Sequence, residues 1–199
     1  MTGLKELQES QFPNQEGVMI DYPSNWIKNG KLNELVESTL QDNKPFAWLF
    51  VGNAGCGKTA MAELMYKDLC KQHKPNWFMT ANALYSKYIN LVSSKDADKA
   101  RDLTNLNQYF NSELFVLDDL GREIGSEAST TFFANLFSEQ YEAFTEGKQH
   151  RCIITTNLHS DQIAKRYGDH VMDRIFEVFT IIKFNNPSYR EKLKKVVEL

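Results

Sequence analysis

Five short apolar runs, separated by longer stretches of mixed character, dominate the pattern of hydrophobic positions along the chain. The runs are continuous rather than alternating, as expected of strands that are buried on both faces of a parallel sheet. They cover residues 46–51, 77–80, 114–117, 152–155 and 179–182. Because stretches of helical periodicity separate them, the pattern predicts an α/β fold with a five-stranded parallel sheet between two layers of helices.

Between the runs, apolar residues recur at the spacing of a helix face. The clearest example is a stripe of Phe132, Phe133, Leu136, Phe137 and Phe144, which predicts one long amphipathic helix. Further helices are predicted from residue 60 to near 75, over 83–92, 103–110, 160–167 and 169–176, and in the basic end of the chain. Ligands of such sheets bind at the carboxyl ends of the strands, so polar residues that follow the apolar runs are the candidate site.

The beginning of the chain has a different pattern. Residues 1–31 are polar and are interrupted by prolines and glycines, so we expect an irregular arm. A short helix over 32–40 would then open one domain that covers residues 32–199. Only about 45 residues precede the first predicted strand, too few for a comfortable independent core.

Composition narrows the class of protein. The 199 residues are 42% hydrophobic, which is typical of a globular chain with a substantial core. The formal net charge of −3 does not indicate a nucleic-acid binder, so any DNA contact would need a local basic patch. The three cysteines show no metal-ligand spacing, and no stretch has the length of a membrane span or the apolar core of a signal peptide. We therefore expect reduced cysteines, no membrane association and a cytoplasmic location.

The segment after the first strand carries the most specific motif. Residues 52–59 fit the phosphate-binding pattern G-x-x-x-x-G-K-[ST] and stand between an apolar run and a helical pattern. In such a loop Lys58 reaches the β- and γ-phosphates and the Thr59 hydroxyl binds Mg²⁺. The predicted nucleotide contacts are Gly52, Asn53, Ala54, Gly55, Cys56, Gly57, Lys58, Thr59 and Ala60. The sequence thus predicts a site for ATP and Mg²⁺; the alternative is a glycine-rich turn with an accidental Lys-Thr.

Polar residues also follow the third and fourth predicted strands. Asp118 is expected to serve the metal held by Thr59, and Asp119 to polarise the attacking water. The alternative for this pair is a solvated turn. Asn157, after the fourth strand, is expected to touch the γ-phosphate or its water; the alternative is a helix cap or a turn residue, since a predicted helix follows.

The order of these motifs resembles that of the AAA+ ATPases. The segment 168–175, with Val-Met-Asp-Arg, resembles the DnaC-type helicase loaders and is similar to the related IstB-type transposition ATPases. The ending 184–190 is also similar to the last strand and tail of the loaders. The resemblance covers roughly residues 32–195 and implies a P-loop NTPase three-layer sandwich, an AAA+ core without a C-terminal helical lid domain.

The resemblance also implies roles for two arginines. Arg174 matches the arginine finger, which reaches the nucleotide of a neighbouring subunit and stabilises the charge of phosphoryl transfer. The alternative is that Asp173 and Arg174 form surface ion pairs. Arg190 matches a sensor arginine that contacts the nucleotide of its own chain, although a solvated basic helix face explains it equally well.

Two departures from the family pattern bear on activity and partners. Many AAA+ members carry Asp-Glu where this chain has Asp-Asp, so slow or partner-stimulated hydrolysis is expected. We expect the separate N-terminal domain with which bacterial loaders grip the helicase to be missing, or reduced to the arm. For single-stranded DNA, the region after the second strand offers Lys87, Tyr88, Lys95, Lys99 and Arg101. The alternative is that Tyr85 and Tyr88 pack in the core and the lysines are solvated.

The resemblance therefore predicts an ATP-dependent accessory ATPase of DNA replication. It would bind and hydrolyse ATP between subunits of a nucleotide-dependent homo-oligomer, and load or remodel a replicative helicase on single-stranded DNA. A transposition helper with a transposase partner is the close alternative. A nucleotide kinase is disfavoured because the arginines are not clustered in a lid, and a non-hydrolysing ATP-dependent interaction protein is a third class.

Overall fold

The computed structural model describes residues 11–13, 19–21, 45–70, 76–93, 112, 114–147, 151–185 and 187–188. The chain divides into two units, Met1–Lys44 and Pro45–Leu199. In the first unit, β1 (Gln11–Pro13) and β2 (Met19–Asp21) pair as a short antiparallel ladder. The pattern of apolar residues did not predict these strands, because three residues are too few to show an alternation. The expected domain boundary after residue 31 stays a prediction.

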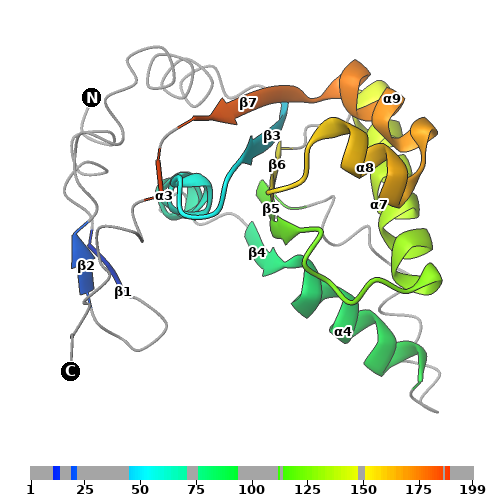
Figure 1. The fold of residues 1–199 in the computed structure, drawn as a ribbon, viewed down its shortest axis with the longest axis horizontal. Coiled ribbons are helices and arrows are strands. Elements are labelled where there is room, and N and C mark those ends of the chain that lie inside the picture. Colours follow the sequence, from blue (N-terminus) through cyan, green and yellow to red (C-terminus); the bar gives the residue numbers. More distant parts are fainter. Residues whose placement is uncertain are drawn as a thin grey trace, which may run out of the picture. The chain divides into compact units, whose positions relative to one another are not determined.

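The second unit is built on a parallel sheet of five strands, coloured cyan to red in Figure 1. The spatial order is β4–β5–β6–β3–β7. Their bounds are β3 (Phe46–Gly52), β4 (Asn76–Thr80), β5 (Leu114–Leu120), β6 (Arg151–Thr156) and β7 (Thr180–Phe184). β3 lies between β6 and β7, while the chain that leaves it next enters the sheet at β4, on the far edge. The loop after β3 therefore stands where the strand order reverses, the usual ligand position in such sheets.

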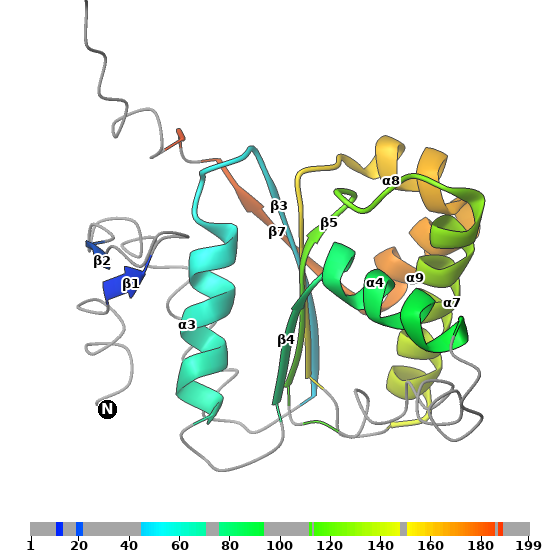
Figure 2. The same cartoon turned by 90° about the horizontal axis from the view of Figure 1, so that it is seen from below.

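Helices cover both faces of the sheet, as Figure 2 shows in the edge-on view. On one face lies α3 (Lys58–Cys70). The other face carries α4 (Ala81–Val92), α7 (Glu127–Thr145), α8 (Ser160–Tyr167) and α9 (Asp169–Val178). This arrangement confirms the predicted α/β three-layer class.

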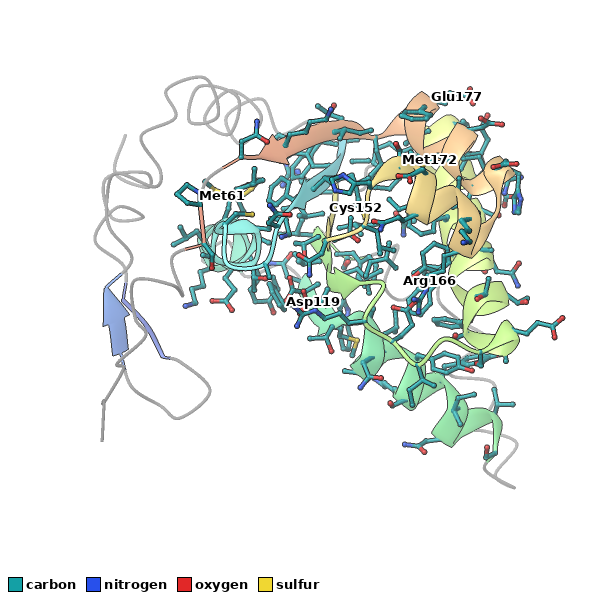
Figure 3. The ribbon with its side chains drawn as sticks, in the orientation of Figure 1. Met61, Asp119, Cys152, Arg166, Met172 and Glu177 are labelled. Carbon is teal, nitrogen blue, oxygen red and sulfur yellow. The ribbon has the colours of Figure 1, made fainter. Side chains whose placement is uncertain are left out.

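The core lies on the face with four helices. Phe133, Phe137 and Leu136 of α7 are almost fully buried against β5 and β6, which confirms the predicted apolar stripe of this helix. Cys152, in the middle of the sheet in Figure 3, is completely buried, and burial raises the pKa of its thiol. Cys152 and Cys56 are both free thiols, as predicted from the odd number of cysteines.

All five predicted strands are confirmed, as are the helices expected at 83–92, 160–167 and 169–176. β5 is longer than predicted: it continues through Asp118 and Asp119 to Leu120, where the apolar pattern had placed its end at Leu117. The helices predicted over 32–40 and 103–110 and in the basic end of the chain lie outside the described residues.

Candidate functional site

The glycine-rich loop joins β3 to α3. β3 ends at Gly52 and α3 begins at Lys58, so Lys58 and Thr59 form the start of the helix. Gly57 has a φ of 102°, in the left-handed region where a side chain would be strained. The N–H groups in the first turn of a helix have no intrahelical acceptors and carry the positive end of the helix dipole. The loop thus has the construction of an anion-binding site.

Lys58 places its charge at the centre of this loop. The side chain is only 5% exposed, and its ammonium donates to the carbonyl oxygens of Gly52 at 2.7 Å and Asn53 at 2.9 Å. It also donates to Asn157 Oδ1 at 2.8 Å and lies 3.6 Å from Cys56 Sγ. All of these acceptors are neutral, so they solvate the ammonium without neutralising it. A buried ammonium whose hydrogen-bond partners are all neutral favours an anionic ligand such as a phosphate.

The Asp118 carboxylate lies beside the start of α3. Its Oδ1 accepts hydrogen bonds from Thr59 Oγ1 at 2.8 Å and from Thr155 Oγ1 at 2.6 Å. Burial raises the pKa of Asp118, and the two hydroxyl hydrogen bonds partly oppose that shift. The predicted alternative of a solvated turn is wrong for Asp118, because the residue is 5% exposed and hydrogen bonded on a strand.

Asp119 has a different environment from its neighbour. It sits at an irregularity of the β5–β6 pairing and has a φ of 57°, the one positive φ among the described non-glycine residues. Its N–H donates to Thr155 Oγ1 at 3.0 Å, and its carboxylate, 31% exposed, lies 3.5 Å from the guanidinium of Arg122. The bulge turns the two adjacent carboxylates into different surroundings: that of Asp118 is buried beside Thr59, and that of Asp119, labelled in Figure 3, is partly open to water.

Asn157 follows β6 and its side chain points to the phosphate loop. Its Oδ1 accepts from Lys58, although 99 residues separate the two in the sequence. The cap of α8 is His159, whose N–H is bonded to the Gln162 side chain, so the predicted alternative of Asn157 as a helix cap is wrong. Four predicted site residues, Lys58, Thr59, Asp118 and Asn157, are therefore brought together by direct contacts.

Arg174 is held elsewhere. It lies on α9, donates from Nη1 to Ser138 Oγ of α7, and places its guanidinium 5.5 Å from the centre of the Tyr141 ring. Tyr141 in turn donates to Glu177 Oε1 at 3.1 Å, a hydrogen bond that raises the pKa of the phenol. α9 and α3 cover opposite faces of the sheet (Figure 2). The contacts of Arg174 are thus with α7 of its own chain.

The remaining predicted contacts divide into two groups. Arg190, Lys95, Lys99 and Arg101 lie outside the described residues. The ring of Tyr88 packs on Phe132, with centroids 4.5 Å apart, and Tyr85 is buried in the same cluster. The structure therefore supports the alternative in which these tyrosines pack in the core.

Two features of this region were not predicted. Thr155 links Asp118 and Asp119 through one hydroxyl, and the only sequence signal was a polar residue at the end of a buried strand. Glu123, just beyond the aspartates, is 4% exposed and contacts Arg166 and Tyr167 of α8. No spacing rule connects residues so far apart, so this contact could not be read from the sequence.

The chemistry of these groups fits Mg²⁺ and a nucleotide triphosphate. A carboxylate and a hydroxyl beside each other are hard oxygen ligands of the kind that Mg²⁺ prefers, together with water and phosphate oxygens. No group of three or more His, Cys, Asp or Glu side chains suited to a metal occurs among the described residues. That agrees with an ion held jointly by protein and nucleotide rather than by a protein cage.

Comparison with known proteins places the chain in a family. A family model described as "IstB-like ATP binding protein" matches residues 5–197, nearly the whole sequence. The chain belongs to the IstB-like ATP-binding proteins. A search of curated proteins gave no significant match to this IstB-like chain.

Solved structures of AAA+ proteins share the fold of this family member. The DnaC helicase loader superposes with a TM-score of 0.63 and 20% identity, covering 78% of this chain and 89% of the loader. DnaI gives a TM-score of 0.57 at 20% identity, covering 79% and 82%. AMPPCP-bound DnaA from Aquifex aeolicus gives 0.62 at 18% identity, and the match spans 83% of this chain and half of DnaA. At these identities the likeness establishes the AAA+ fold, as the order of motifs predicted.

The described residues include no helix that is both long and apolar enough to cross a membrane.

Proposed function

We propose that the protein is an ATPase that acts as an accessory factor of DNA replication, loading or remodelling a replicative helicase on single-stranded DNA. ATP would bind in the loop at 52–59 with Lys58 on its phosphates, and Mg²⁺ would be held by Thr59 and Asp118. When bound, the ion would neutralise charge on the β- and γ-phosphates. Asp119 would orient the attacking water.

The single observation that carries this proposal is the set of contacts between Lys58, Asn157, Thr59 and Asp118. They join three separate segments at one end of the sheet: the start of α3, the end of β5 and the connection after β6. A buried cation, an amide oxygen and a buried carboxylate–hydroxyl pair are the groups that phosphoryl transfer needs. The similarity in fold to the DnaC helicase loader and DnaI supports replication as the setting.

Arg174 would complete the site of a neighbouring copy. Its guanidinium lies on α9, and its partners Ser138 and Tyr141 are neutral, so it can exchange them for a γ-phosphate without leaving an unpaired charge behind. This supports a nucleotide-dependent homo-oligomer in which each site is shared by two subunits.

A second candidate function is a helper ATPase of transposition, with a transposase as the partner. The match to the IstB-like family model favours it, and it would use the same ATP site. The two functions differ in the protein that the assembly engages and not in the chemistry of the site.

The test is ATP turnover with and without single-stranded DNA, using wild type, Lys58→Ala, Arg174→Ala and a mixture of the two variants. If Arg174 acts across an interface, the mixture recovers part of the activity that each inactive variant lacks, because some interfaces then combine an intact loop with an intact arginine. Turnover by a monomer that is indifferent to DNA would refute the loader proposal.

Partner identity needs a separate measurement. Purified replicative helicase and transposase from the same source would be tested for binding to the protein with ATP and with ADP. ATP-dependent capture of the helicase supports the first function, and capture of the transposase supports the second. Transfer of phosphate to a nucleoside monophosphate would instead indicate a kinase.

A further inference from the structure

A buried carboxylate lies four residues beyond Asp119 and plays no part in the site described above. The Glu123 side chain is fully enclosed, although glutamate is seldom buried without a partner. It lies in the segment between β5 and α7, shortly after Asp119, the residue with a positive φ near the end of β5. The burial of a charge at this position requires compensating contacts.

One oxygen of Glu123 closes the turn that carries Asp119. Glu123 Oε2 accepts from the backbone N–H of Gly121 at 2.8 Å, and the N–H of Arg122 donates to the carbonyl of Asp119 at 3.1 Å. Gly121 has a φ of 97°, and a Cβ there would lie 2.6 Å from Leu158. The turn is thus tight, admits only glycine at its centre, and is fastened from within by the Glu123 carboxylate.

The other oxygen fastens the same turn to α8. Glu123 Oε1 lies 2.9 Å from Arg166 Nη2 and accepts a hydrogen bond from the Tyr167 hydroxyl. Arg166 Nη2 also donates to the backbone carbonyl of Glu123 at 2.9 Å. The contacts run from Asp119 through the turn to Arg166, and Figure 3 labels both ends. Tyr167 is itself 2% exposed among the aromatic residues of the core, so the anchor is rigid.

We propose that Glu123 is a positioning residue for ATP hydrolysis: it anchors the turn that bears Asp119 to Arg166 and Tyr167 of α8. This inference rests on the proposed ATPase function. The burial of the carboxylate makes each of its hydrogen bonds directional and stable, as an oriented water or a reacting group requires. Because α8 is followed directly by the helix that carries Arg174, the same anchor links the two halves of the shared site within one chain.

The test compares Glu123→Gln and Tyr167→Phe with a control, Glu127→Gln, which changes an exposed glutamate on α7. Glu123→Gln keeps the shape of the side chain and removes its charge; Tyr167→Phe keeps the buried ring and removes one donor. We expect kcat to fall roughly 10- to 100-fold for Glu123→Gln, the usual effect of a displaced catalytic group, and less for Tyr167→Phe. The dissociation constant for ATP should change by less than about twofold in every variant.

Hydrogen exchange and subunit mixing separate positioning from general loss of structure. Amides of residues 119–123 should exchange faster in both variants, while those of β3 and α3 stay protected. Mixing Glu123→Gln with Arg174→Ala should restore activity, because the Arg174→Ala chain has an intact Asp119 turn and receives an intact arginine. Mixing Glu123→Gln with Lys58→Ala should not restore it, because both chains then have a defective loop or turn.

The outcomes are distinct. Wild type that hydrolyses no ATP even with single-stranded DNA and the partner protein present would refute the proposed function itself. Active wild type with unchanged kcat in Glu123→Gln, or a parallel loss of ATP affinity and kcat, would overturn the positioning role. The positioning role would also be overturned if Glu123→Gln regained activity on mixing with Lys58→Ala but not on mixing with Arg174→Ala. Glu123 would then act on Arg174 and not on Asp119. If Glu123→Gln does not fold, the same measurements on Tyr167→Phe decide whether the anchor positions Asp119.

Discussion

The two halves of the proposed shared site differ in how far a single chain completes them. Around the phosphate loop, Lys58, Thr59, Asp118 and Asn157 already contact one another and are largely enclosed. Around α9, Arg174 rests on a hydroxyl and an aromatic ring of α7, partly open to solvent. The first half is organised for a ligand of its own chain. The second is organised around contacts that are easily exchanged, as expected of a group that works on another molecule.

The largest expected effect comes from a substitution in the phosphate loop, the enclosed half of the proposed shared site. Lys58→Ala removes the buried charge at the centre of the loop, so ATP binding should weaken and turnover should fall at least about 100-fold. The measurement is titration with a fluorescent ATP analogue together with steady-state hydrolysis. Lys67→Ala, an exposed lysine on the same helix, is the control and should behave as wild type.

A substitution of Arg174, in the other half, should lower the rate of ATP hydrolysis without weakening ATP binding. Arg174→Ala should lower turnover roughly 1,000-fold, in the range known for arginine fingers, with ATP affinity nearly unchanged. Arg174→Lys should recover little, because an ammonium cannot reproduce the planar, forked guanidinium. If Arg174→Ala lowered ATP affinity as much as it lowered turnover, Arg174 would act in the site of its own chain. The proposed division of the site between two subunits would then be wrong.

A smaller effect concerns the free energy of unfolding of the protein without nucleotide. The raised pKa of Asp118 means that the folded protein holds this proton more tightly than the unfolded chain does. The ionised carboxylate therefore costs stability above the raised pKa, and that cost disappears as the pH falls through it. Asp118→Asn should raise the free energy of unfolding at neutral pH by roughly 1 kcal/mol while abolishing hydrolysis.

Thermal unfolding of wild type and Asp118→Asn at neutral and acidic pH measures this effect. The difference between the two proteins should shrink on acidification, because wild type then carries the neutral acid. Destabilisation by Asp118→Asn at neutral pH would show that the hydrogen bonds from Thr59 and Thr155 outweigh the burial of charge.

The smallest effect tests how Arg174 is held. Tyr141→Phe loses the hydrogen bond to Glu177 and keeps the ring beneath the guanidinium, so turnover should stay within about twofold of wild type. Tyr141→Ala removes the ring as well and should lower turnover several-fold. Equal results for the two variants would mean that the ring does not prearrange Arg174.

Local patterns in the sequence were sufficient for the strands of the parallel sheet and for the phosphate loop, and they placed Asn157 at the same edge of the sheet as that loop. Continuous apolar runs specify buried strands, and parallel strands bring their carboxyl ends to one edge. The pattern failed where polar residues continue a strand. Asp118 and Asp119 have the polarity of a loop, yet both belong to β5, which has a bulge there. It also could not reveal the contact of Glu123 with Arg166, because an ion pair across 43 residues depends on how two helices and a turn pack.

The left-handed backbone at Asp119 bears on protein engineering. Aspartate and asparagine tolerate that conformation because their short side chains can hydrogen bond locally, whereas longer side chains are less accommodated there. Replacing Asp119 with the glutamate found in many AAA+ proteins would therefore change the course of the main chain along with the reach of the carboxylate. Any redesign of this position would have to treat residues 118–123 as a unit, since the bulge, the glycine and the buried glutamate form one hydrogen-bonded turn.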